Sequence, residues 1–331
     1  MITRRRIVVA LGAGALTPLA SFAQQQPAKV ARIGFLASRS RSTPSDPEIY
    51  YDAFMQEMRE LGYIEGKNLN IEWRFADGKY ERLPGFAAEL VQMKVEIIVT
   101  HGVPGTQAAQ RATRIIPIVT AAVNDPVGTG FAASLARPGG NITGMSNTVN
   151  DVSIKHIELL KAMVPKLSRV AILMNPGNAS HPANLKNIQV AARHAGIKVL
   201  PVDARSSEEI ERGFGSMKRE RARAVIIATD PFFQQQRRQI IAMAAKNKLP
   251  SMFSFREEVR AGGLMSYGAN LPDIYRRAAT YVDKILKGAK PGDLPIEQPT
   301  RFELVINRWT AQALGLTISR EMLLRADAVI E

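Results

Sequence analysis

The ten residues 224–233, AVIIATDPFF, carry the pattern that decides the fold of this chain. The first five are all apolar, and a strand without alternating polar residues is typical of a parallel sheet that is buried on both faces. The Asp-Pro pair that follows suits the start of a helix, because aspartate caps helix N-termini and proline fits the first turn. The stretch therefore predicts a buried strand that leads directly into a helix.

The same alternation of short apolar strands and amphipathic helices continues along the chain from residue 30 onward. Strict alternation of this kind predicts an α/β fold of right-handed βαβ units, in which helices cover both faces of parallel sheets. Strands are expected at residues 30–36, 69–75, 97–100, 116–120, 142–145, 170–174, 198–202, 224–228, 251–253 and 263–267. Helices are expected at residues 49–61, 80–93, 152–163, 184–195, 207–219, 233–247 and 274–286.

The strand series restarts at residue 170, which predicts two lobes that are each a doubly wound parallel sheet. A chain of 331 residues is long enough for two such cores. We expect residues 27–147 and about 264–295 in the first lobe, and residues 148–263 and about 296–331 in the second. A tail that crosses between the lobes in this way forms a multi-stranded hinge, which allows the lobes to close around a ligand.

Composition and motifs argue against several classes of function. The 44 Lys and Arg against 30 Asp and Glu give a net charge of +14, but the charges are scattered and no nucleic-acid-binding module is visible, so we expect no nucleic-acid partner. The chain contains no cysteine, and its four histidines lie far apart without metal-ligand spacing, at positions 101, 156, 181 and 194. Neither a Walker loop nor a G-x-G-x-x-G motif follows a strand. The sequence therefore predicts no metal, no cofactor and no enzymatic activity.

The first 23 residues have the features of an export signal. A positive segment with Arg4, Arg5 and Arg6 precedes an apolar stretch at residues 7–16, and a small-x-small site ends at Ala23. The general secretory and twin-arginine routes both fit this pattern. Without a cysteine the mature chain has no site for an N-terminal lipid anchor, so we expect cleavage near Ala23 and a soluble periplasmic protein.

Candidate ligand-binding residues follow the strands, because open parallel sheets bind ligands beyond the carboxyl ends of their strands. The turn at 102–105 offers backbone N–H groups to an anion. Asp125 and Asp230 each precede a proline, so they are either helix caps or cleft carboxylates that hold an ammonium or hydroxyl group. The complete candidate set is Ser38, Gly102, Val103, Gly105, Asp125, Ser146, Asn147, Asn175, Asn178, Asp230, Phe232, Phe255 and Tyr267.

Four longer segments carry a resemblance to a known family: ELGYIEGKN at 60–68, NDPVG at 124–128, ARPGGNITG at 136–144 and AGGLMSYG at 261–268. They resemble the ABC transporter substrate-binding protein family, whose relatives include tryptophan-type amino-acid binders. The resemblance covers residues 30–331. It implies a type I periplasmic binding protein that captures a small molecule, such as an amino acid or related solute, and delivers it to an ABC permease. From the restarted strand series and the tail that completes a hinge, we expect a monomer.

Two other functions remain open from the sequence. A ligand-sensing periplasmic protein that docks on a membrane receptor would share the fold and the cleft, and would differ in its docking surface. An exported enzyme is the third alternative, and the missing nucleophiles and metal ligands argue against it.

Overall fold

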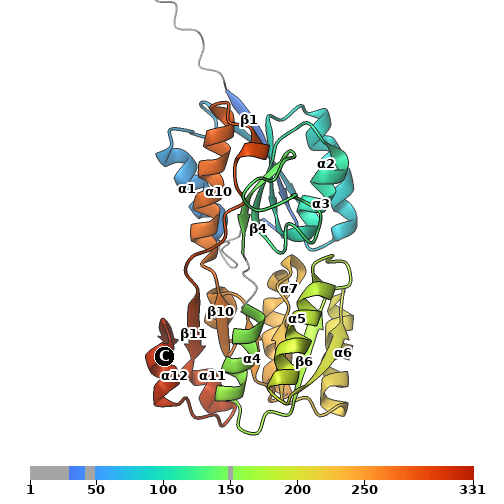
Figure 1. The fold of residues 1–331 in the computed structure, drawn as a ribbon, viewed down its shortest axis with the longest axis vertical. Helices are drawn as coiled ribbons and strands as arrows, with labels where there is room; N and C mark the ends of the chain where they lie inside the picture. Colours follow the sequence, from blue (N-terminus) through green and yellow to red (C-terminus); the bar gives the residue numbers. More distant parts are fainter. Residues whose placement is uncertain (1–29, 42–48, 148–151) are drawn as a thin grey trace, which may run out of the picture.

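The computed structural model describes residues 30–41, 49–147 and 152–331, which form two α/β lobes, one above the other in Figure 1. Each lobe contains one sheet with helices packed on both of its faces, which confirms the predicted fold class. The expected export signal at residues 1–23 lies outside the described residues.

The sheet of the first lobe contains five parallel strands in the order β2-β1-β3-β4-β5. The strands are β1 (Ala31–Ala37), β2 (Leu69–Phe75), β3 (Ile97–His101), β4 (Ile118–Val123) and β5 (Ile142–Ser146). Helices α1 (Ile49–Glu60) and α10 (Leu271–Leu286) cover one face, and α2 (Leu83–Gln92) and α3 (Gly102–Ala112) cover the other. Both faces are buried, so β4 is apolar or small along its whole length.

Helix α10 comes late in the sequence but lies beside α1 in the first lobe (Figure 1). Its Tyr275 packs into an aromatic cluster, with its ring centroid 6.4 Å from that of Phe35 and 5.9 Å from that of Tyr51. The core of the first lobe is therefore completed by a segment that returns from the second lobe.

The sheet of the second lobe has the order β12-β11-β10-β9-β8-β6-β7 and is parallel except for the pair β10 and β11. Its strands are β6 (Arg169–Met174), β7 (Lys198–Asp203), β8 (Ala224–Ile227), β9 (Ser251–Phe253), β10 (Met265–Gly268), β11 (Glu303–Asn307) and β12 (Ala328–Ile330). Its helices are α4 (Val152–Met163), α5 (His181–His194), α6 (Ser207–Arg219), α7 (Pro231–Gln235), α8 (Arg237–Lys246), α9 (Arg256–Arg260), α11 (Arg308–Ala313) and α12 (Arg320–Arg325). Short 3-10 turns, η1 (Tyr80–Arg82) and η2 (Pro291–Asp293), lie in the first lobe's connections. Helices α3 and α9, the turn η2 and the elements after β11 had no counterpart among the expected helices and strands.

The chain passes between the lobes after β5, between β10 and α10, and before β11. Beside β5, the backbone N–H of Ser146 donates to Glu297 O at 2.8 Å, and that of Glu297 donates to Gly144 O at 3.0 Å. Strand β10 belongs to the second sheet, so the chain returns to the first lobe with α10, a few residues later than the boundary expected at about 264. These crossings make the hinge multi-stranded.

A bulge at the end of β4 shapes the first-lobe side of the gap between the lobes. The pairing of β4 with β5 is regular to Thr120 and shifts before Val123, and Ala122 adopts a φ of 58°. Gly144 is required opposite, because its φ is 128° and a Cβ there would lie 2.2 Å from Thr120 O. The bulge ends the strand just before Asn124, whose side chain reaches the second lobe.

Candidate functional site

A pocket of about 360 Å³, which we call the central cavity, lies between the lobes at the carboxyl ends of both sheets. The first lobe contributes the turn after β4 and the end of β5, and the second contributes the first turns of α4 and α5 with the ends of β8, β9 and β10. Its lining residues are Asn124, Asp125, Pro126, Val127, Leu135, Ser146, Asn147, Val152, Ser153, His156, Ser180, Ala183, Asn184, Asn187, Ile188, Ile226, Ile227, Ala228, Thr229, Ser254, Phe255, Tyr267, Gly268 and Gln298. The volume falls in the range of small-molecule sites.

Hydrogen bonds join the two lobes beside this cavity, and we call them the interlobe clasp. They include Arg39 Nη1 to Gln234 Oε1 at 3.0 Å, Ser40 N to Gln235 Oε1 at 2.8 Å, Tyr80 Oη to Asp230 Oδ1 at 2.8 Å, and Asn124 Nδ2 to Thr229 O at 3.4 Å. Each bond has one partner in each lobe, so it forms only when the lobes meet. The structure is therefore a closed arrangement of the two lobes.

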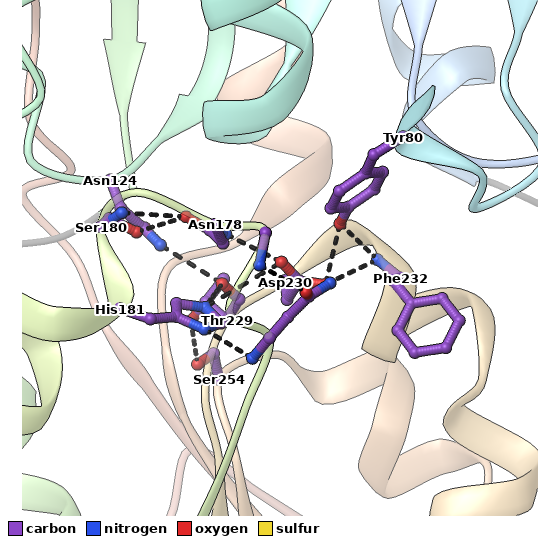
Figure 2. A network of polar contacts seen from close by, with 11 residues as sticks. Tyr80, Asn124, Asn178, Ser180, His181, Thr229, Asp230, Phe232 and Ser254 are labelled. Atoms are coloured by element: carbon purple, nitrogen blue, oxygen red, sulfur yellow. Dashed lines mark hydrogen bonds and ion pairs between the residues drawn. The ribbon is translucent and has the colours of Figure 1, made fainter. Parts of the chain in front are cut away.

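Asp230 is the centre of the clasp and is fully buried. Its Oδ1 accepts hydrogen bonds from Tyr80 Oη at 2.8 Å, Asn175 Nδ2 at 3.1 Å and the backbone N–H of Phe232 at 3.0 Å, and its Oδ2 accepts from Asn178 Nδ2 at 2.8 Å. Tyr80 reaches this carboxylate from the first lobe, as Figure 2 shows. The pKa of Tyr80 is raised well above its ordinary value by burial and by the charge of Asp230, so the phenol remains a donor. Asp230 thus caps α7 and also links the lobes.

The second-lobe residues around Asp230 are fixed by bonds of their own. Asn178 Oδ1 accepts from the backbone N–H and the hydroxyl of Ser180, at 3.1 and 2.8 Å. His181 Nδ1 accepts from Asn175 N at 2.8 Å, which places the ring proton on Nε2, and Nε2 donates to Thr229 O at 3.2 Å. This side of the cavity is therefore held by hydrogen bonds within the second lobe.

The polar groups that line the central cavity are mostly uncharged. Asn124 and Asn147 are 8% and 5% exposed, and their side-chain oxygens, like that of Asn184, have no hydrogen-bond partner within the described residues. Burial lowers the pKa of His156 to about 4, so its ring is neutral, and Nε2 donates to Tyr267 O at 2.8 Å. The lining therefore offers amide and hydroxyl groups together with the aromatic faces of Phe255 and Tyr267.

Several sequence-predicted residues do meet at this place. Asp125, Ser146, Asn147, Phe255 and Tyr267 line the central cavity, and Asn175, Asn178 and Asp230 meet in the clasp beside it. Asp125 is exposed, has a φ of 42°, and accepts from the backbone N–H of Gly128 at 2.9 Å, so it closes a turn at the rim and caps no helix. Contact of these residues with a ligand stays a prediction.

The expected anion-binding turn at 102–105 does not reach the cavity. Val103 is 1% exposed in the first-lobe core, and Gly105 packs against Ser38 Oγ, where a Cβ would lie at 3.3 Å. Gly102 has a φ of 71° and faces Pro231 of the other lobe, whose Cγ would lie 2.8 Å from a Cβ. Phe232 is likewise a core residue of the second lobe. The sequence places the turn at 102–105 and Phe232 near strand ends, but packing within and between the lobes keeps these residues away from the central cavity.

Other residues at the site were not in the predicted set. Asn124 and Ser254 directly follow β4 and β9, so the rule of strand ends would have selected them. Tyr80 and His156 come from η1 and α4, where nothing in the sequence marks them for the cleft. They reach it only through the packing of whole lobes.

A second cavity, of about 530 Å³, shares Phe255 with the central one and lies between α1 and α10 of the first lobe and α7, α8 and α9 of the second. Arg39, 3% exposed, lies here with its guanidinium 5.2 Å from the centroid of the Tyr50 ring. Burial, and then the neighbouring carboxylate of Glu257, raise the pKa of Glu258 to about 8. A neutral carboxyl group is thus buried close to the clasp.

Across the part of the chain that the structure describes, no helix is long and apolar enough to cross a membrane. The same residues contain no group of three or more His, Asp or Glu side chains that could hold a metal ion.

Comparisons with known proteins agree with the fold and the resemblance seen in the sequence. The model of a family described as ABC transporter substrate binding protein matches residues 42–330. A tyrosine-binding protein of Clostridioides difficile is 26% identical over 263 residues, which are 80% of this chain and 75% of that protein. A Streptococcus pneumoniae ABC domain solved in complex with L-Trp has a TM-score of 0.84 at 27% identity, over 91% of this chain and 99% of that one. A conserved domain protein of Vibrio cholerae has a TM-score of 0.84 at 28% identity, over 91% and 100% of the two chains.

Proposed function

The chain belongs to the ABC transporter substrate-binding protein family, and from this we propose that it captures a small organic solute in the central cavity and delivers it to an ABC permease. The observation that carries the proposal is the central cavity itself, which both lobes line and which the interlobe clasp borders. Closure of two lobes around a ligand is a common way to bury it. The ligand then leaves when the clasp opens at the permease.

We propose an amino acid or a related solute as the ligand. Two similar proteins carry names with an aromatic amino acid, tyrosine in one and L-Trp in the other. The lining of the central cavity supports this size and character, because Phe255 and Tyr267 supply apolar walls while asparagine, serine and threonine side chains supply hydrogen bonds. Aromatic walls with a few polar anchors suit a ligand that has one apolar and one polar end.

We also propose that the protein works as an exported monomer, without a cofactor and without catalysis. The basic and apolar segments before Ala23 support export. Fractionation of cells that express the full chain tests this: we expect a shortened protein that is released from spheroplasts without detergent. An intact leader in the membrane fraction would contradict it.

Binding is tested by thermal-shift screening of the purified protein against amino acids, nucleosides, sugars and aromatic acids, followed by calorimetric titration of the hits. A ligand at 100 times its Kd should add roughly 2.7 kcal/mol to the free energy of unfolding. Uptake of the labelled hit should fall in cells that lack the gene and return when the gene is restored. A hit that binds while uptake is unchanged would contradict delivery to a permease.

A further inference from the structure

Two helices of the second lobe begin at the central cavity. Helix α4 lines it with Val152 and Ser153, and α5 lines it with Ala183 and Asn184. The two helices pack against each other, and their first turns lie on the side of the second lobe that faces the first (Figure 1). Because a helix carries partial positive charge at its start, two helix starts at one cavity favour a bound anion.

The chain itself uses the first N–H groups of α5, with one exception. Ser180 N and His181 N both donate to Asn178, to its Oδ1 and its O, each at 3.1 Å. Pro182 has no N–H group. The N–H of Ala183 has no acceptor within the described residues, and Ala183 lines the cavity. This N–H group is therefore open to a ligand.

Side-chain donors from both lobes line the same cavity. Ser153 is 8% exposed, and its hydroxyl makes no hydrogen bond within the described residues. Asn147 of the first lobe is 5% exposed, and because its Oδ1 is enclosed, its amide nitrogen is the polar side-chain atom that can reach a ligand. The same holds for Asn184 of α5, whose Oδ1 is also enclosed. Donors buried in this way are stabilised when an acceptor reaches them.

The charges of the described lining leave this place open to an anion. The one charged side chain, Asp125, lies exposed at the rim of the first lobe, where solvent screens its charge. Burial lowers the pKa of His156 to about 4, so its ring is neutral. The described lining contains no lysine or arginine. Hydrogen bonds from N–H and O–H groups would therefore hold the anion, as backbone amides hold an oxyanion.

We infer that the starts of α4 and α5 form a carboxylate-binding subsite of the central cavity, in which the Ser153 hydroxyl and the Ala183 N–H donate to the ligand. Asn184 adds an amide donor from the same lobe, and Asn147 adds one from the first lobe. The inference rests on the proposed function, because it describes one end of the ligand of the same cavity. Since the donors come from both lobes, they reach one carboxylate together only when the lobes are closed. The subsite takes the place of the turn expected at 102–105.

Matched pairs of compounds test the subsite. The purified protein is screened by thermal shift with L-tryptophan, L-tyrosine, L-leucine and benzoate, each beside its primary amide, and with nucleosides and sugars. We expect stabilisation by the acids, and calorimetric titration should give a Kd at least about tenfold higher for the amide, as expected when hydrogen bonds to a charged group are lost. Equal binding of an acid and its amide, or binding of nucleosides or sugars alone, overturns the inference and leaves the proposed function intact. If none of these compounds binds, the proposed function fails and the inference fails with it.

Ser153→Asp places a carboxylate on the subsite itself. An acidic residue suits the first turn of a helix, so the variant should melt no lower than the wild type. The Kd of the tightest-binding acid of the screen should rise at least about tenfold, while its amide should bind no more weakly. Ser207→Asp makes the same change in the first turn of α6, outside the lining of the cavity, and should leave both Kd values unchanged. An unchanged Kd for the acid in a folded Ser153→Asp protein contradicts the inference.

Asn147→Leu tests the donor from the first lobe. The substitution keeps the approximate size of the side chain and removes its amide, so the Kd of the same acid should rise more than the Kd of its amide. An equal rise for both compounds would show that Asn147 acts on closure alone and would remove it from the subsite.

Discussion

Replacing Tyr80 with phenylalanine should weaken ligand binding about tenfold without destabilising either lobe. The substitution removes two hydrogen bonds between the lobes. Tyr80 Oη donates to Asp230 Oδ1 at 2.8 Å and accepts from Phe232 N at 3.0 Å, and the bond to the charged carboxylate contributes about 1.5–3 kcal/mol. Asp230 keeps three donors from its own lobe, Asn175, Asn178 and the N–H of Phe232. The loss of binding free energy should therefore be near the lower end of this range. About 1.5 kcal/mol corresponds to a factor of about ten in Kd.

The effect should fall on closure, because Tyr80 belongs to the first lobe and Asp230 to the second. When the free protein is mainly open and the ligand binds the closed form, any free energy lost from the closed form is lost from the binding free energy as well. Calorimetric titration gives the Kd, and small-angle scattering with and without ligand gives the change in radius of gyration. Since the pKa of Tyr80 is raised, the difference between the wild type and the variant should be the same from pH 6 to pH 9.

Asp230→Asn is the matched control for this prediction. It places an amide among three donors of the second lobe, so at least one buried bond is lost and we expect a fall of about 1–3 kcal/mol in the free energy of unfolding. Tyr80→Phe should change that free energy by less than about 0.5 kcal/mol. An unchanged Kd in Tyr80→Phe, or a loss of stability as large as that of Asp230→Asn, would refute the assignment of Tyr80 to closure.

Three further substitutions test other parts of the structure. Gly102→Ala should favour the open form and raise the Kd about tenfold or more, because the φ of 71° strains a side chain and its Cβ would lie 2.8 Å from Pro231 Cγ; scattering that still reports full closure would count against this. Val103→Ser should lower the free energy of unfolding by about 2 kcal/mol and leave the Kd unchanged, since Val103 is a core residue 1% exposed; a change in Kd without a change in stability would place it in the binding site instead. Glu258→Gln should make the protein more stable than the wild type above pH 8. The pKa of this carboxyl group rises from 4.5 to about 8 on folding, so the stability that it contributes below pH 4.5 is lost as the pH rises to about 8. The melting temperatures of the two proteins should therefore diverge between pH 4.5 and pH 8, and parallel curves of melting temperature against pH would be the contrary result.

The sequence alone determined the architecture and part of the site. The apolar run that begins at Ala224 forms β8, and Asp230 caps the helix that follows, as the order of residues predicts. Asn175 and Asn178 follow β6, which pairs with β8, so their approach to Asp230 also follows from the rule that parallel strands end at one edge. Burial patterns and capping residues depend on a few neighbouring positions, so they can be predicted from the sequence.

Only the tertiary structure decided which strand-end residues line the central cavity and which form hydrogen bonds between the lobes. Val103 and Gly105 follow β3 just as Asn124 follows β4, yet α3 packs them into the first lobe while the bulge at Ala122 precedes an asparagine that reaches the second. Tyr80 meets a carboxylate 150 positions away because the two lobes contact each other at that point. The orientation of a helix on its sheet and the contact of one lobe with another are sums of many weak, long-range packing interactions, and no local pattern of residues specifies them.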